Sequence, residues 1–122
     1  MSPEQVVRSF CEAVTRLDVK ELSGFFSADA VYHNIPIDPV TGPEAIEKVL
    51  AQFLGPASRA EFELRALAVS GRSVLTERVD RFTIGDKQVE LAVMGVFEVA
   101  RDGKITAWRD YFDMAQFSRQ LA

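Results

Sequence analysis

The second half of the chain is dominated by hydrophobic residues that recur with a period of two, a pattern typical of β-strands. Four runs show this alternation, and short segments that contain glycine or aspartate separate them. Tight turns of this kind join neighbouring antiparallel strands. We therefore expect an antiparallel meander of four strands, over residues 61–70, 73–84, 87–100 and 104–114.

The first half of the chain carries helical signals instead. Pro3 is suited to a first helical position, Ser2 can cap that helix, and Gln5 completes a capping box. Further elements are expected in the form of helices over residues 18–26 and 42–54, a short extended piece over 30–36, and a partial helical turn over 114–122. This order predicts one α+β domain over residues 1–122, in which the N-terminal helices pack on the concave face of a curved, mixed or antiparallel sheet and leave a cone-shaped pocket.

The expected strand over residues 87–100 is apolar on both faces. One face is expected to lie in the interior, and the other to lie under a helix or a second subunit. Gly95 at the centre of this strand predicts a bend or a bulge that curls the sheet.

Two charged residues interrupt the more apolar face of the strand over residues 73–84. Alternate residues share a face of a strand, so Arg78 and Asp80 lie between Val74 and Phe82. Desolvating a charge costs several kcal/mol unless the charge is well paired. Asp110 interrupts an aromatic face of the last strand in the same way.

Tyr32 and Asn34 share one side of the extended piece, although asparagine is disfavoured in strands. Three separate segments therefore offer polar groups, and two interpretations are compatible with their spacing. In the first, the polar groups converge on one apolar cavity. In the second, Arg78 and Asp80 belong to a surface ladder on an edge strand, Asp110 caps a turn, and Tyr32 and Asn34 are ordinary loop residues.

Convergence of these segments would have a chemical consequence. One guanidinium between two carboxylates leaves a net charge of about −1 in an apolar site, which favours retention of a proton by one of the carboxylates. A carboxylate and a carboxylic acid side by side can take a proton from water and give one to a departing oxygen. Opening a strained ring or eliminating a leaving group needs this pairing.

Other classes of site have less support in the sequence. The net charge is −4 and there is no basic run, which argues against binding to nucleic acid or to an anionic membrane. His33 has no partner at metal-ligand spacing, so neither a metal site nor a cofactor is expected. The single cysteine, Cys11, allows no internal disulfide, and together with the absence of a leader-like segment it favours a cytoplasmic protein.

Three motifs in this order resemble those of the limonene-1,2-epoxide hydrolase family over nearly the whole chain: VYHNIP, TERVD and GKITAWRDYFD, with LAVMGVFEV between the last two. The resemblance implies the curved-sheet cone of the nuclear-transport-factor-two-like superfamily. It also implies an epoxide hydrolase that adds water to a lipophilic epoxide in one step, without a covalent intermediate.

The resemblance implies a role for each polar residue. The general acid would be Asp80, the general base Asp110, and the arginine that bridges them Arg78, while Tyr32 and Asn34 would position the water. A homodimer is expected as well. The expected pocket wall comprises Val74, Phe82, Leu91, Val93, Trp108, Phe112 and Met114.

Two rival functions are considered beside this one, because one fold hosts many chemistries. The first is an isomerase, dehydratase or cyclase on the same cone, although an enolising isomerase gains little from a buried arginine. The second is a non-catalytic module that binds a small molecule. Such a module would be expected to have lost one of the five polar residues, and none is missing.

Overall fold

A computed structural model describes all residues, 1–122. Ten elements follow one another along the chain: α1 (Pro3–Val14), α2 (Val19–Ser23), β1 (Phe26–Asn34), β2 (Val40–Thr41), α3 (Pro43–Leu54), β3 (Ala57–Ser70), β4 (Ser73–Ile84), β5 (Lys87–Val99), β6 (Ile105–Tyr111) and α4 (Met114–Leu121). The capping box expected at Ser2 and Gln5 is formed at the start of α1. None of the helices combines the length and the apolar character that a membrane crossing requires.

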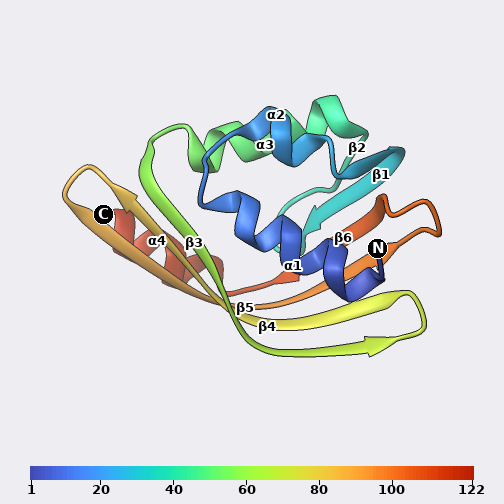
Figure 1. Ribbon diagram of the computed structural model, residues 1–122. Coiled ribbons are helices and arrows are strands. Elements are labelled where there is room, and N and C mark those ends of the chain that lie inside the picture. Colours follow the sequence, from blue (N-terminus) through green and yellow to red (C-terminus); the bar gives the residue numbers. More distant parts are fainter.

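All six strands form one mixed sheet in the order β2-β1-β6-β5-β4-β3 (Figure 1). The predicted meander is present as β3, β4, β5 and β6, each antiparallel to the next. Strand β1 joins the sheet beside β6 and runs parallel to it. The α+β class and the curved mixed sheet are therefore as expected, and the sheet has two strands beyond the meander.

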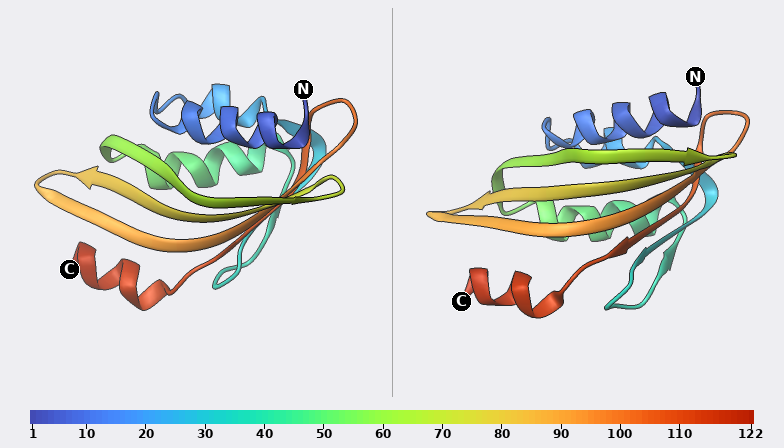
Figure 2. Two further views of the ribbon diagram at one scale, coloured as in Figure 1. Left: turned by 60° about the horizontal axis from the view of Figure 1, so that its bottom comes forward. Right: turned by 90° about the horizontal axis from the view of Figure 1, so that it is seen from below.

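Helices α1, α2 and α3 lie on the concave side of the sheet (Figures 1 and 2). The apolar stripe of α1 is buried against the sheet, and Phe10 at its centre packs on Phe26, Phe97 and Trp108. Helix α4 lies beside β5 (Figure 2), and its Phe117 contacts Phe53 of α3. Strand β6 pairs with β5 only from Met94 onward, so α4 lies beside the part of β5 that β6 leaves uncovered.

Several boundaries differ from the expected ones. The second helix covers only Val19–Ser23, because Asp18 caps it and Phe26 already begins β1. Strand β6 ends at Tyr111, where Asp113 accepts hydrogen bonds from the first backbone amides of α4. The expected partial turn at the C-terminus is a complete helix of 8 residues.

Of the bend or bulge predicted at Gly95, the bulge is absent. The register between β4 and β5 and that between β5 and β6 both run without a break through Gly95. The irregularity in the pairing of β5 with β6 lies instead between Glu98 and Val99.

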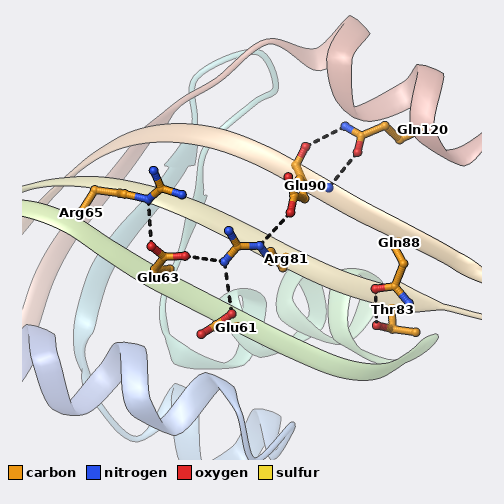
Figure 3. A network of polar contacts seen from close by, with 8 residues as sticks. All are labelled: Glu61, Glu63, Arg65, Arg81, Thr83, Gln88, Glu90 and Gln120. Atoms are coloured by element: carbon orange, nitrogen blue, oxygen red, sulfur yellow. Dashed lines mark hydrogen bonds and ion pairs between the residues drawn. The ribbon is translucent and has the colours of Figure 1, made fainter.

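The convex face of the sheet carries a network of charged side chains (Figure 3). Arg81 of β4 pairs with Glu61 and Glu63 of β3 and with Glu90 of β5. The side-chain amide of Gln120 on α4 exchanges hydrogen bonds with the backbone N–H and C=O of Glu90, both at 2.7 Å (Figure 3). These ion pairs are exposed, so each contributes little to stability, but together they connect three strands.

Candidate active site

The register of the sheet places the polar residues of three strands on the concave face. Asn34 of β1 lies opposite Asp110 of β6, Asp110 lies opposite Gly95 of β5, and Gly95 lies opposite Thr76 of β4. The five expected site residues are buried, each at most 5% exposed: Tyr32, Asn34, Arg78, Asp80 and Asp110. The sheet thus brings them together and contradicts the alternative of a surface ladder and loop residues.

The Arg78 guanidinium binds both aspartates. Its Nε and Nη2 donate to Asp80 Oδ1 and Oδ2 at 3.0 and 2.9 Å. Nη2 also donates to Asp110 Oδ2 at 2.8 Å, and Nη1 donates to Asp110 Oδ1 at 3.2 Å and to Thr76 Oγ1 at 3.2 Å. Every nitrogen of the guanidinium is therefore used, and its planar fork fixes the two carboxylates relative to each other.

Gly95 explains how Arg78 reaches Asp110. The two residues are on β4 and β6, and β5 lies between these strands. A side chain at Gly95 would overlap both Arg78 Nη1 and Asp110 Oδ1, because a Cβ built there meets these two atoms. Glycine at this position leaves the space through which the guanidinium crosses the middle strand.

Burial and charge together shift the pKa values of the site. Burial raises the pKa of Asp80 from 3.8 to about 6, the neighbouring Arg78 lowers it, and the negative Asp110 raises it further. Burial alone would lower the pKa of Arg78, but the charges of Asp110 and Asp80 outweigh burial, so that pKa lies well above its ordinary value. Asp80 therefore holds a proton near neutral pH more readily than an ordinary aspartate does.

Tyr32 and Trp108 form a stacked pair beside the aspartates. Their ring centroids are 4.0 Å apart and the ring planes differ by 10°. Burial and the charge of Asp110 raise the pKa of Tyr32 well above 10, so its hydroxyl keeps its proton and can both donate and accept hydrogen bonds. His33 points to the opposite side of β1 and is half-buried, as strand alternation requires.

A small apolar cavity of about 40 Å³ opens onto four of the five polar residues. Tyr32, Asn34, Asp80 and Asp110 line it, whereas Arg78 lies behind the two carboxylates and outside the wall. The apolar part of the wall consists of Val14, Leu50, Phe53, Leu54, Phe62, Phe82, Leu91, Val93, Phe112 and Phe117.

Four of the expected wall residues line this cavity: Phe82, Leu91, Val93 and Phe112. The other three do not. Val74 and Trp108 are fully buried in the core below the cavity, and Met114 is the first residue of α4 and lies outside the wall. Strand alternation predicts which face a residue occupies, but not whether a helix covers that residue.

The helical part of the wall was not predicted from the sequence. Val14 comes from α1, Leu50, Phe53 and Leu54 come from α3, and Phe117 comes from α4. The apolar stripe of α3 indicates a buried face in general, and only the packing of the helix shows that this face meets the cavity. No group of three or more His, Cys, Asp or Glu side chains is placed so that it could hold a metal ion.

Comparisons with known proteins identify the family of this chain. The family model for the limonene-1,2-epoxide hydrolase catalytic domain matches residues 1–122. Epoxide hydrolase EphG of Mycobacterium tuberculosis (strain ATCC 25618 / H37Rv) is 34% identical over 115 residues, which span 94% of this chain and 76% of that protein.

Solved structures show the same relationship. A structure of an M. tuberculosis LEH-like epoxide hydrolase superposes with a TM-score of 0.81 at 33% identity, covering 96% of this chain and 90% of that one. A SnoaL-like polyketide cyclase from Shewanella denitrificans OS-217 reaches a TM-score of 0.85 at 16% identity, covering 98% and 96% of the two chains, and shows the shared cone fold alone. The chain therefore belongs to the limonene-1,2-epoxide hydrolase family and is an epoxide hydrolase of that type.

Proposed function

We propose that the protein adds water to a lipophilic epoxide in one step and releases a vicinal diol. The observation that carries this proposal is the buried Asp80–Arg78–Asp110 arrangement at the wall of an apolar cavity. Two carboxyl groups fixed by one guanidinium supply an acid and a base within reach of the same small molecule.

The proposed step balances with the groups at hand. Asp110 accepts a proton from water while the water oxygen forms a bond to an epoxide carbon. The bond between that carbon and the ring oxygen breaks, and the carboxylic acid of Asp80 donates its proton to the departing oxygen. Asp110 then holds one proton and Asp80 is ionised, so transfer of a proton between them through solvent restores the starting state.

Tyr32 and Asn34 are proposed to hold the attacking water. Both line the cavity, and Asn34 lies directly opposite Asp110 in the paired strands β1 and β6. An amide and a hydroxyl next to the base can orient the water toward the substrate, which lowers the entropic part of the barrier. The arginine bridge distinguishes this arrangement from an enolising isomerase, which needs donors aimed at an oxyanion.

The wall of the cavity supports a lipophilic substrate, because 11 of its 14 residues are hydrophobic. The volume of about 40 Å³ is a few times the roughly 10–15 Å³ that a cavity needs to hold one water molecule. A substituted epoxide is larger, so its entry requires that side chains of the wall move. Phe53, Phe112 and Phe117 are the half-buried aromatic residues of the wall at its helical side.

Replacement of the proposed base tests this function. Asp110→Asn should abolish hydrolysis with little change in fold, because the amide has the same shape but cannot accept a proton from water. Terpene, styrene, fatty-acid and sterol epoxides would first be screened with the wild-type protein to identify a substrate. A variant that kept more than about a tenth of the wild-type kcat would remove Asp110 from this role.

The one-step route also predicts where a label appears. In a single turnover in heavy-oxygen water with enzyme in excess, the label should enter the diol directly. A covalent route would deliver an unlabelled aspartate oxygen to the diol and leave the label in the protein. Label in a peptide that contains Asp80 or Asp110 would contradict the one-step proposal.

We further propose that the protein is a homodimer that uses the convex face of its sheet. Exposed apolar side chains gather there, with Leu75 39%, Met94 51% and Tyr111 48% exposed. Met94 and Tyr111 lie opposite each other on β5 and β6, and Leu75 lies opposite Val96.

The single, buried Cys11 supports a reducing compartment such as the cytoplasm.

A further inference from the structure

Trp108 donates a hydrogen bond to the proposed base. Its indole Nε1 lies 2.7 Å from Asp110 Oδ1, and the two residues share a face of β6 because they are two positions apart. Trp108 is 0% exposed and Asp110 is 4% exposed, so water does not compete for this contact. A hydrogen bond to a charged group in such surroundings is among the stronger ones in proteins.

The donors that reach Asp110 are distributed unequally between its two oxygens. Oδ1 accepts from Trp108 Nε1 and from Arg78 Nη1, whereas Oδ2 accepts from Arg78 Nη2 alone. A carboxylate oxygen offers about two lone-pair sites. Oδ1 is therefore saturated, and Oδ2 is the oxygen with capacity to accept a proton from water.

The packing around Trp108 holds its N–H in one direction. Tyr32 stacks on one side of the ring at 4.0 Å, and Phe97 stacks at 5.3 Å with an interplanar angle of 16°. The edge of the indole meets Phe10 of α1, with ring centroids 5.0 Å apart. The ring cannot turn without breaking these contacts, and its position also sets that of Tyr32.

We propose that Trp108 is a positioning residue for epoxide hydrolysis: its N–H fixes the Asp110 carboxylate so that Oδ2 faces the attacking water, and its ring supports Tyr32. The proposal rests on the assignment of Asp110 as the base. Trp108 lies outside the wall of the cavity, so it acts through these two residues and not on the substrate.

The proposal predicts a change in the pH profile, so the charges around Asp110 must be identified. Arg78 and Asp80 face it from β4, Tyr32 from β1 and Cys11 from α1. Burial raises the pKa of Cys11 to about 12, and the pKa of Tyr32 lies well above 10, so both stay neutral between pH 4 and pH 8. Ionisation of these two side chains therefore does not change the charge around Asp110 in that interval.

The single tryptophan of the chain permits a substitution of minimal size. Expression in a tryptophan auxotroph supplied with 3-benzothienylalanine replaces the indole N–H by sulfur at position 108 alone. The stacked ring is retained and only the donor is lost. We expect kcat to fall about tenfold to a hundredfold, the range for one lost hydrogen bond to a charged group. KM should change by less than about threefold, and the acidic limb of the pH profile should move to higher pH, because the carboxylate loses a donor that stabilises its charged form.

Two variants accompany this experiment. Trp108→Phe should show the same loss of kcat and the same shift of the pH profile. Phe26→Leu removes another ring that stacks on the indole, with centroids 6.0 Å apart, and leaves the N–H in place, so it should lower the melting temperature without moving the pH profile.

The outcomes distinguish failure of the proposed role of Trp108 from failure of the assignment of Asp110 as the base. An analogue protein with wild-type kcat and pH profile overturns the role of Trp108 if Asp110→Asn is inactive. If Asp110→Asn is active, the base is misassigned and the proposed function fails together with this inference. A pH profile that moves in Phe26→Leu as far as in the analogue would show that packing, and not the hydrogen bond, controls the base.

Discussion

Gly95 is a residue whose missing side chain makes the site possible. Arg78 must cross β5 to reach Asp110, and the space above Gly95 is where it crosses. A methyl group there would displace the guanidinium or the carboxylate, and a buried charge that loses its partner costs several kcal/mol. A glycine inside a strand ordinarily weakens that strand. At position 95 it is explained by the space that the ion pairs of Arg78 require.

We expect Gly95→Ala to reduce kcat at least a hundredfold and to lower the melting temperature. Both effects would be measured on the same preparation, by turnover of the identified epoxide and by thermal unfolding. Thr76→Val is a useful companion, because it removes a hydroxyl that accepts from Arg78 Nη1 but adds nothing to the crossing point. It should reduce turnover less than Gly95→Ala, and wild-type turnover in Gly95→Ala would show that Arg78 does not need this passage.

The sequence predicts much of the site at this scale, and the reason for its limits is geometric. Alternation correctly places Arg78, Asp80 and Asp110 on the concave face, and burial of charge then suggests that they are paired. It cannot show that Trp108 lies beneath the cavity and donates to Asp110, since both a wall residue and a core residue occupy the same face. The catalytic roles of Arg78, Asp80 and Asp110 stay predictions until the variants are measured.

Among the elements, the meander was predictable from the sequence because tight turns join its strands. The strand that pairs with β1 was not predictable in this way. Parallel pairing of β1 with β6 joins segments about 75 residues apart in sequence. No turn residues connect the two strands directly, so the local sequence does not indicate that they pair. The consequence is functional, because this pairing places Asn34 opposite Asp110. Likewise, the apolar face of α3 was evident, but its contact with the cavity depends on how the helix crosses the sheet.

Helix α4 depends on a few contacts, which makes its attachment testable. It has no buried residues, and Gln120 bonds to the Glu90 backbone on the edge of β5 that β6 leaves free. Phe117 of this helix packs edge-on against Phe53 of α3, with ring centroids 5.8 Å apart, at the wall of the cavity.

We expect Gln120→Ala to leave the Glu90 amide open to solvent. Hydrogen exchange of this amide, followed by NMR, should accelerate at least tenfold, while the amides of β4 that pair with β5 keep their wild-type rates. Gln116→Ala removes a side-chain amide from the same helix without touching Glu90 and serves as the control. Unchanged exchange at Glu90 in Gln120→Ala would mean that the rest of α4 holds the helix in place without this contact.

Ionisation of Asp80 affects the free energy of unfolding of the whole molecule. The pKa of Asp80 is about 6 in the folded protein, whereas its ordinary value, which applies to the unfolded chain, is 3.8. The folded state therefore binds the proton more tightly than the unfolded state does. Stability is then greatest below about pH 4 for this group and falls as the pH rises toward 6. The loss is on the order of 3 kcal/mol at 1.36 kcal/mol per pKa unit.

Comparison with Asp80→Asn isolates this effect from the titration of other carboxyl groups. The amide resembles the protonated acid, so urea unfolding should give similar free energies for the two proteins near pH 4. Between pH 4 and pH 7 the wild-type protein should lose stability relative to the variant. A difference that does not change with pH would show that ionisation of Asp80 carries no folding cost.

The convex face of the sheet has few unpaired charges, which suits assembly of the proposed homodimer. The charged side chains on this face are largely paired with one another, as with Arg81 among Glu61, Glu63 and Glu90, and Arg109 with Glu98. Burial of the apolar area around Met94 and Tyr111 therefore requires few charges to lose a partner. A two-fold dimer brings the same patch of each copy together, so one substitution changes the interface twice.

Met94→Glu should convert the dimer to a monomer, because it would bury two further carboxylates near the centre of the interface, beside Glu77, which lies opposite Met94 and has no ion-pair partner. Light scattering after size-exclusion chromatography would measure the mass, and circular dichroism would verify that the variant is folded. Ile37→Glu is the matched control, because Ile37 is also exposed, at 41%, but lies in the connection between β1 and β2 and not on the convex face. A monomeric wild-type protein, or a Met94→Glu variant that remains dimeric, would exclude this face as the interface.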